Sequence, residues 1–81
     1  MRFSQLRDFV AIVDAGSIRA AARALGVTHP ALTKSMRLLE SELGVELIRR
    51  NTRGVALTAT GQAFVARARA IQAEVRKAEE E

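Results

Sequence analysis

The side chains best suited to recognise another molecule lie in one stretch, residues 28–37. Within it, His29, Thr33 and Arg37 recur at a spacing of four, which places them on one face of a helix, and Lys34 lies beside them. All of these side chains donate hydrogen bonds. The major groove of DNA presents a distinct pattern of base-edge donors and acceptors to such a helix. The stretch therefore predicts a helix that contacts bases and phosphates, in preference to an ordinary solvated face.

The start of this stretch also favours anion binding by the backbone. Thr28 is suited to cap the helix, and Pro30 fits the first turn because the N–H that proline lacks has no partner there. The free N–H groups of such a turn suit phosphate oxygens. We therefore expect Thr28 and Pro30 to lie at the DNA backbone.

A second candidate site is the basic segment Arg50-Asn51-Thr52-Arg53-Gly54. Its two arginines bracket a tight turn, so we expect both to reach one nearby anion. An arginine at a hairpin tip can enter a narrow minor groove, where the negative potential is deepest. The alternative is that Arg50 and Arg53 only keep the hairpin soluble. The DNA role is favoured, more strongly for Arg53.

Charge and composition narrow the class of partner. The net charge is +4 over 81 residues, which suits a polyanion such as nucleic acid or an anionic membrane surface. No apolar run approaches the ~20 residues of a membrane span, and the amino terminus does not resemble a signal peptide, so a cytoplasmic protein is expected. Cysteine is absent and histidine occurs once, so neither a disulfide nor a metal site nor a cofactor is expected.

Three helices would position the donor face. Apolar residues at helical spacing predict helices from Ser4 to Ala15, from Ser17 to a stop at Gly26, and from Thr28 to a stop at Gly44. The first residue of each range is expected to be its N-cap. Short extended runs at 45–49 and 55–57 flank the basic segment and predict a small hairpin. The inward stripe of the third helix is expected to consist of Leu32, Ser35, Met36, Leu39 and Leu43. Whether Arg19 and Arg23, on one face of the second helix, contact the DNA backbone is left open.

The last predicted helix is capped by Thr58 and carries an apolar stripe with alternating spacings of four and three. That spacing is typical of a helix that pairs with another helix. The helix would overrun a core made by three short helices, so pairing with a second copy is favoured over packing on its own domain. The stripe consists of Phe64, Ala68, Ile71, Val75 and Ala78.

The ordered set of these pieces resembles the amino-terminal region of the LysR-type transcriptional regulators, and the resemblance covers almost the whole chain. The matching stretches are Leu6-Arg7-Asp8-Phe9-Val10, Gly16-Ser17-Ile18 with Ala21-Ala22, residues 25–34, residues 39–50, and Leu57-Thr58 with Gly61.

The resemblance implies a mainly α fold. A winged helix-turn-helix, with three helices and a small β-hairpin wing, would span residues 1–58, and a linker and dimerisation helix would span 59–81. It implies a homodimer that binds double-stranded DNA on a partly palindromic operator, with the third helix in the major groove and the wing in the minor groove. It further implies a bacterial regulator whose larger effector-binding domain is not in this chain. That domain would bind any small-molecule effector and support a tetramer.

The resemblance also assigns positions. Thr28, His29, Pro30, Thr33 and Lys34 occupy those that face bases and phosphates, while Arg50 and Arg53 occupy the wing positions.

Two departures from the family bear on base preference. The family most often has glutamine where His29 stands and arginine where Lys34 stands. Glutamine pairs bidentately with adenine, which histidine does not, and lysine offers a point charge instead of a planar fork. The preferred bases are therefore expected to differ. Ile48, which stands where the family usually has phenylalanine, keeps the apolar role.

Two other classes of function compete with DNA binding. A helical interaction module would explain the stripe of the last helix, but neither the donor face nor the basic hairpin. An enzyme has little support, because the chain has no phosphate-cradling glycine loop and no clustered carboxylate pair, and so small a helical domain leaves little room for a substrate pocket.

Overall fold

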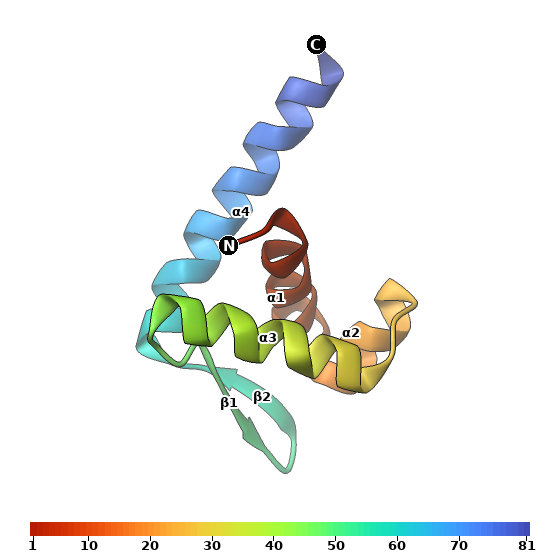
Figure 1. Cartoon of the computed structure of the whole chain (residues 1–81), viewed down its shortest axis with the longest axis vertical. Helices are drawn as coiled ribbons and strands as arrows, with labels where there is room; N and C mark the ends of the chain where they lie inside the picture. The colour runs from red at the N-terminus through yellow and green to blue at the C-terminus, as the bar shows by residue number, and fades with distance from the viewer.

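The computed structural model describes all residues, 1–81, and has the expected winged helix-turn-helix order. The helices α1 (Phe3–Ala15), α2 (Ile18–Leu25) and α3 (His29–Leu43) form the body. The strands β1 (Ile48–Asn51) and β2 (Gly54–Leu57) form an antiparallel hairpin, and α4 (Ala59–Glu80) completes the chain. Figure 1 shows the hairpin projecting beneath α3, while the far half of α4 extends away from the body.

The core forms where α1 meets the other helices. Its largest fully buried side chains are Phe9 and Ile12 of α1, Leu32 and Leu39 of α3, and Leu47 of the segment before the hairpin. Because α1 contacts α2, α3 and α4, it is the central element of the body. The buried stripes of α1 and α3 therefore fix which side of α3 remains outside.

Three of the four predicted helix caps are confirmed. Ser17 Oγ accepts from Ala20 N at 3.1 Å, Thr28 Oγ1 from Ala31 N at 3.2 Å, and Thr58 Oγ1 from Gly61 N at 2.9 Å. Each bond satisfies one backbone donor that the first turn leaves without a partner.

The predicted start of the first helix at Ser4 is wrong by one residue. The N-cap is Arg2, whose backbone N donates to Gln5 Oε1 at 2.7 Å. Gln5 thus supplies half of a capping box, and Ser4 lies within the first turn.

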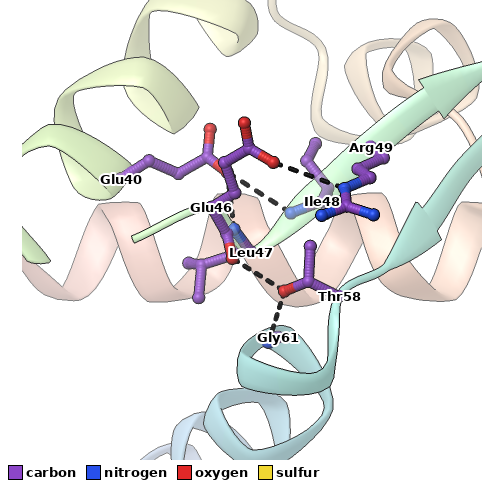
Figure 2. A network of polar contacts seen from close by, with 7 residues as sticks. All are labelled: Glu40, Glu46, Leu47, Ile48, Arg49, Thr58 and Gly61. Atoms are coloured by element: carbon purple, nitrogen blue, oxygen red, sulfur yellow. Dashed lines mark hydrogen bonds and ion pairs between the residues drawn. The ribbon is translucent and has the colours of Figure 1, made fainter. Parts of the chain in front are cut away.

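The predicted first strand of the hairpin, 45–49, is also displaced. Glu40 Oε2 accepts from Leu47 N at 2.6 Å and from Ile48 N at 3.3 Å (Figure 2). Leu47 O accepts from Thr58 N at 3.0 Å. These contacts hold residues 45–47 against α3 and the start of α4, so the strand ladder begins only at Ile48.

This displacement shortens the predicted link between the strands. Arg50 pairs with Val55 and Asn51 with Gly54, so the loop is only Thr52-Arg53. The hairpin also docks on the body, because Val55 N donates to Gly16 O at 3.0 Å. A Cβ added at Gly54 would overlap that same carbonyl, so the close approach requires glycine there.

The inward stripe of α3 departs from expectation at its end. Leu32, Met36 and Leu39 are buried, but Leu43 is exposed. At this level α3 meets the first turn of α1, where Gln5 Nε2 donates to Glu42 Oε1 at 3.2 Å. The end of α3 is therefore held to α1 by a polar contact of Glu42, and Leu43 stays outside the core.

Three of the five residues in the stripe on α4 pack on their own domain. Ala68 is 0% exposed, and the ring of Phe64 lies 5.7 Å from that of Phe9, centroid to centroid. Ile71 packs against the same core, whereas Val75 and Ala78 lie outside it. The expectation that the whole stripe faces a partner is therefore wrong for Ala68, which has no surface left to offer.

Candidate nucleic-acid interface

The predicted donors of α3 lie on its outer face. His29, Lys34 and Arg37 are exposed and Thr33 is half-buried, so none lies in the hydrophobic interior. Together with Arg50 of β1 they surround a surface hollow of about 520 Å³. Its lining residues are His29, Pro30, Thr33, Lys34, Arg37, Leu38, Ser41 and Arg50.

The sequence alone does not link Arg50 to this face. Its Nη2 donates to Thr33 Oγ1 at 3.2 Å, and Thr33 Oγ1 lies 3.4 Å from His29 Nδ1. A continuous polar chain therefore runs from the hairpin to the first turn of α3.

Arg53 lies apart from this chain, at the exposed tip of the hairpin. Its backbone N donates to Asn51 Oδ1 at 2.8 Å, a local bond that fixes the turn. Arg53 does not line the hollow, whereas Arg50 does. The two wing arginines thus have different surroundings.

Arg19, whose role the sequence left open, lies beside this face. A second hollow, of about 150 Å³, separates the start of α2 from the hairpin and is lined by Arg19, His29 and Arg50, among others. The signal in the sequence is that Arg19 follows the cap Ser17 by two residues, in the first turn of the helix that precedes α3.

The electrostatics of this face are those of an anion-binding surface. No carboxylate lines either hollow. The side-chain cations that do pair with acids within 4.0 Å lie elsewhere: Arg7 with Asp8, Arg49 with Glu46, and Arg69 with Asp14. Lys34, Arg37, Arg50 and Arg53 have no such partner, so their charge remains available to a polyanion.

Two pKa shifts report ionic contacts away from this face. The terminal amine of Met1, 2.8 Å from Glu42 Oε2, and the amide of Gln5 hold the pKa of the Glu42 carboxyl below its usual value. The hydrogen bond from Arg69 to Asp14, at 2.8 Å, raises the pKa of the Arg69 guanidinium. The first ties α3 to the chain start, and the second ties α4 to α1.

A buried polar contact fixes how α3 presents its donors. Asp8 of α1 is only 5% exposed, and its Oδ2 accepts from Ser35 Oγ at 2.6 Å. Arg7 donates to Oδ1 of the same carboxylate at 2.8 Å, which offsets the cost of burying a charge. Because Ser35 follows Lys34 directly, this contact orients the turn of α3 that carries the donors.

No group of three or more His, Asp or Glu side chains is arranged to hold a metal ion. Among the four helices, none combines the length and the apolar character that crossing a membrane would require.

Comparison with known proteins gives consistent matches. The model for bacterial regulatory helix-turn-helix proteins of the lysR family matches residues 3–62. The HTH-type transcriptional regulator TcbR of Pseudomonas sp. is 48% identical over 71 residues, 88% of this chain and 24% of that protein. The regulator ClcR of Pseudomonas putida is 48% identical over 69 residues, 85% of this chain and 24% of that protein. This chain thus spans about a quarter of the length of these relatives.

Solved structures with the same fold include protein–DNA complexes. The CbnR_DBD–DNA complex matches with a TM-score of 0.94 at 42% identity, covering 99% of this chain and 92% of that one. The BenM_DBD complex with benA site 1 DNA matches with a TM-score of 0.94 at 34% identity, covering 99% of this chain and 93% of that one. Each of these matches spans nearly all of both chains.

Proposed function

Because this chain belongs to the lysR family of bacterial regulatory helix-turn-helix proteins, we propose that it binds specific double-stranded DNA sites as the DNA-binding part of a regulator of transcription. The observation that carries the proposal is the acid-free hollow on the outer face of α3, where His29, Thr33, Lys34 and Arg37 gather with Arg50. The relatives named above are transcriptional regulators and not enzymes, in line with the sequence analysis, which found little support for an enzyme.

The outer face of α3 enters the major groove. His29 and Thr33, in its first two turns, reach base edges, while Lys34 and Arg37 lie toward the phosphates. Thr28 and Pro30 place the free N–H groups of the first turn at the DNA backbone. Support comes from the exposure of all these residues except Thr33, which is half-buried beside the hollow.

The hairpin contributes a second contact. Arg53 at its tip enters the adjacent minor groove, where a narrow groove concentrates negative potential. Arg50 lies at the root of the wing and is already engaged with Thr33, so its part is at the major-groove surface. Arg19, beside the same hollow, adds a phosphate contact from α2.

A second copy binds through α4. An apolar strip begins at Ile71, which packs against the core, and continues through Val75 and Ala78 beyond the body. The neighbouring hollow of about 350 Å³ is lined mainly by apolar residues, including Phe3. Phe3 is 69% exposed, which is unusual for a phenylalanine outside an interface. The dimer surface therefore includes Phe3, which the sequence did not suggest, and excludes Ala68.

Such a dimer divides the chain into a DNA-binding unit, residues 1–58, and a dimerisation helix, 59–81. Two α3 helices would enter major grooves about one helical turn apart on a partly palindromic operator. The protein acts in the cytoplasm, where bacterial DNA lies. Effector binding and tetramer formation belong to a further domain of a longer regulator.

Titration of a labelled duplex pool at low and high salt tests the proposal. We expect binding that weakens steeply with salt, because phosphate contacts release condensed counterions. Lys34→Ala should lower the slope of log affinity against log salt by about one unit. If the chain bound no duplex at low salt, DNA binding would be excluded and the competing interaction module favoured.

A further inference from the structure

We propose that Arg50 is a positioning residue that acts through Thr33 to hold His29 in a single tautomer, and that this tautomer selects a base with an exposed acceptor. The selection of a base rests on the proposed DNA-binding function. The fixed tautomer of His29 does not, because it concerns the chain free in solution.

The direction of the hydrogen bonds follows from the chemistry of the three groups. The Arg50 guanidinium carries donors only, so at 3.2 Å it donates to Thr33 Oγ1. The hydroxyl proton of Thr33 then points away from the cation. The nitrogen His29 Nδ1 lies 3.4 Å from the same oxygen. A cationic donor strengthens the hydroxyl as a donor in its turn, so the chain runs Arg50 to Thr33 to His29.

Few groups nearby can accept the hydroxyl proton. Glu40 lines an adjoining hollow with Thr33 and Arg50, but it already accepts from the backbone N–H groups of Leu47 and Ile48. No carboxylate lines the hollow of about 520 Å³, and the other charged side chains there, Lys34 and Arg37, are donors. His29 Nδ1 is therefore the acceptor that the surrounding side chains leave to Thr33. In a neutral imidazole whose Nδ1 accepts, the proton resides on Nε2.

The exposed edge of His29 is consequently a donor. The ring lies in the first turn of α3, at the border of both hollows. In the major groove, an Nε2–H can pair with guanine O6 or N7, adenine N7 or thymine O4. Guanine alone offers two adjacent acceptors, so the geometry favours guanine at the base that faces His29.

The tautomer can be measured directly, because His29 is the only histidine in the chain. In alkaline buffer, where a histidine ring is neutral, we expect imidazole ¹⁵N shifts of an unprotonated Nδ1 and a protonated Nε2. Thr33→Val and Arg50→Ala should both move the two shifts toward each other, while Thr33→Ser and Arg50→Lys should restore the separation. Equal shifts in the unaltered chain, or a protonated Nδ1, would overturn the proposal.

The base preference is tested on duplexes that the chain itself selects from a random pool. Replacing single guanines by 7-deazaguanine removes the N7 acceptor. At one position per half-site, affinity should fall about threefold to tenfold, the value of one hydrogen bond. In the Thr33→Val variant, the same base replacement should lower the affinity by about twofold or less. An equal loss in both proteins, or no sensitive guanine, would refute the selection of guanine by His29.

The proposed DNA binding and the tautomer of His29 can be refuted independently of each other. If the chain bound no duplex, the proposed function would fall while the nitrogen shifts still decided the tautomer. If it bound duplexes with an averaged imidazole, the positioning role of Arg50 and the base selection by a fixed tautomer would both fall, while the proposed DNA binding would stand. Thermal unfolding of each variant checks that the fold is retained; Thr33→Ala replaces Thr33→Val if the valine variant unfolds.

Discussion

The cations of this small domain differ in what surrounds them, and that difference assigns their roles. Arg7, Arg49 and Arg69 are held by acids of the same chain. Arg50 is held by a hydroxyl, which leaves its charge uncompensated. Arg53 has neither kind of partner on its side chain and stands at the hairpin tip. A phosphate can therefore approach Arg53 without displacing an internal contact.

Arg53→Ala is expected to weaken binding to many DNA sequences alike. Loss of one cation near the phosphates should lower affinity and reduce the salt slope by about one unit, without changing the preferred sequence. Fluorescence anisotropy with specific and unrelated duplexes over a salt series measures both effects.

Arg49→Ala is the matched control for Arg53→Ala. It removes the same charge from the same hairpin, but Arg49 Nε already lies 3.4 Å from Glu46 Oε2. Its effect on the slope should be clearly smaller. Equal effects of the two substitutions would mean that the tip of the wing makes no particular contact.

At the scale of elements, the junction of hairpin and α4 holds the wing in place. Thr58 Oγ1 donates to Glu46 O at 2.7 Å and accepts from Gly61 N at 2.9 Å, so one hydroxyl joins two elements (Figure 2). Glu40 of α3 meanwhile caps the start of β1 through two backbone N–H groups. Helix α3, the base of the wing and α4 therefore meet at residues 46–48.

Thr58→Ala is expected to lower the free energy of unfolding by about 1–2 kcal/mol, because it removes the cap of α4 and the bond to Glu46 O. Urea denaturation followed by circular dichroism measures the loss. Thr58→Ser keeps the hydroxyl and should recover most of it. A serine variant as unstable as the alanine variant would show that the methyl group, and not the hydrogen bonds, matters here.

Gly61→Ala is expected to destabilise the fold, contrary to the usual effect of this change in a helix. Alanine ordinarily gains up to about 1 kcal/mol over glycine. At Gly61, however, an added Cβ would overlap the carbonyl oxygen of Leu47, a backbone atom held by Thr58 N. We expect a net loss of about 1–3 kcal/mol, as in overpacked cores.

The sign of the Gly61→Ala effect is the test. Ala63→Gly, on the exposed face of the same helix, is the control and should cost about 1 kcal/mol by propensity alone. A Gly61→Ala chain more stable than the original in urea denaturation would show that α4 can shift away from Leu47.

At the scale of the whole molecule, α4 connects DNA binding to assembly. One side of its first half is buried against α1, and Figure 1 shows its second half projecting from the body. The opposite side carries Ala59, Ala63, Ala66 and Ala70, all exposed. Two faces are thus available to a second copy, and the one with Val75 and Phe3 has the larger apolar side chains. Burial of large apolar surface contributes most to association.

Val75→Glu is therefore expected to dissociate the dimer, since a partner would have to bury a carboxylate without a counter-charge. Sedimentation velocity measures the association, and the affinity for a two-half-site duplex should fall with it. Ala70→Glu, about 140° away around the helix, is the control and should leave both unchanged. The reverse result would place the partner on the alanine face.

The sequence alone determined those features that depend on residues close together in the chain. Helix caps and stops depend on residues within one turn, so Ser17, Thr28 and Thr58, with Gly26 and Gly44, could be identified without coordinates. The donor face of α3 follows in the same way, because helical spacing and a buried stripe fix the opposite side.

Only the tertiary structure decided the contacts between segments far apart in the chain. Arg50 meets Thr33 across 17 positions, and Glu40 sets the start of β1 from the preceding helix. Likewise, the stripe on α4 has the spacing of a partner-binding helix, yet the body of its own chain covers Ala68. Spacing shows that a face is apolar, but which surface covers it depends on how the elements pack.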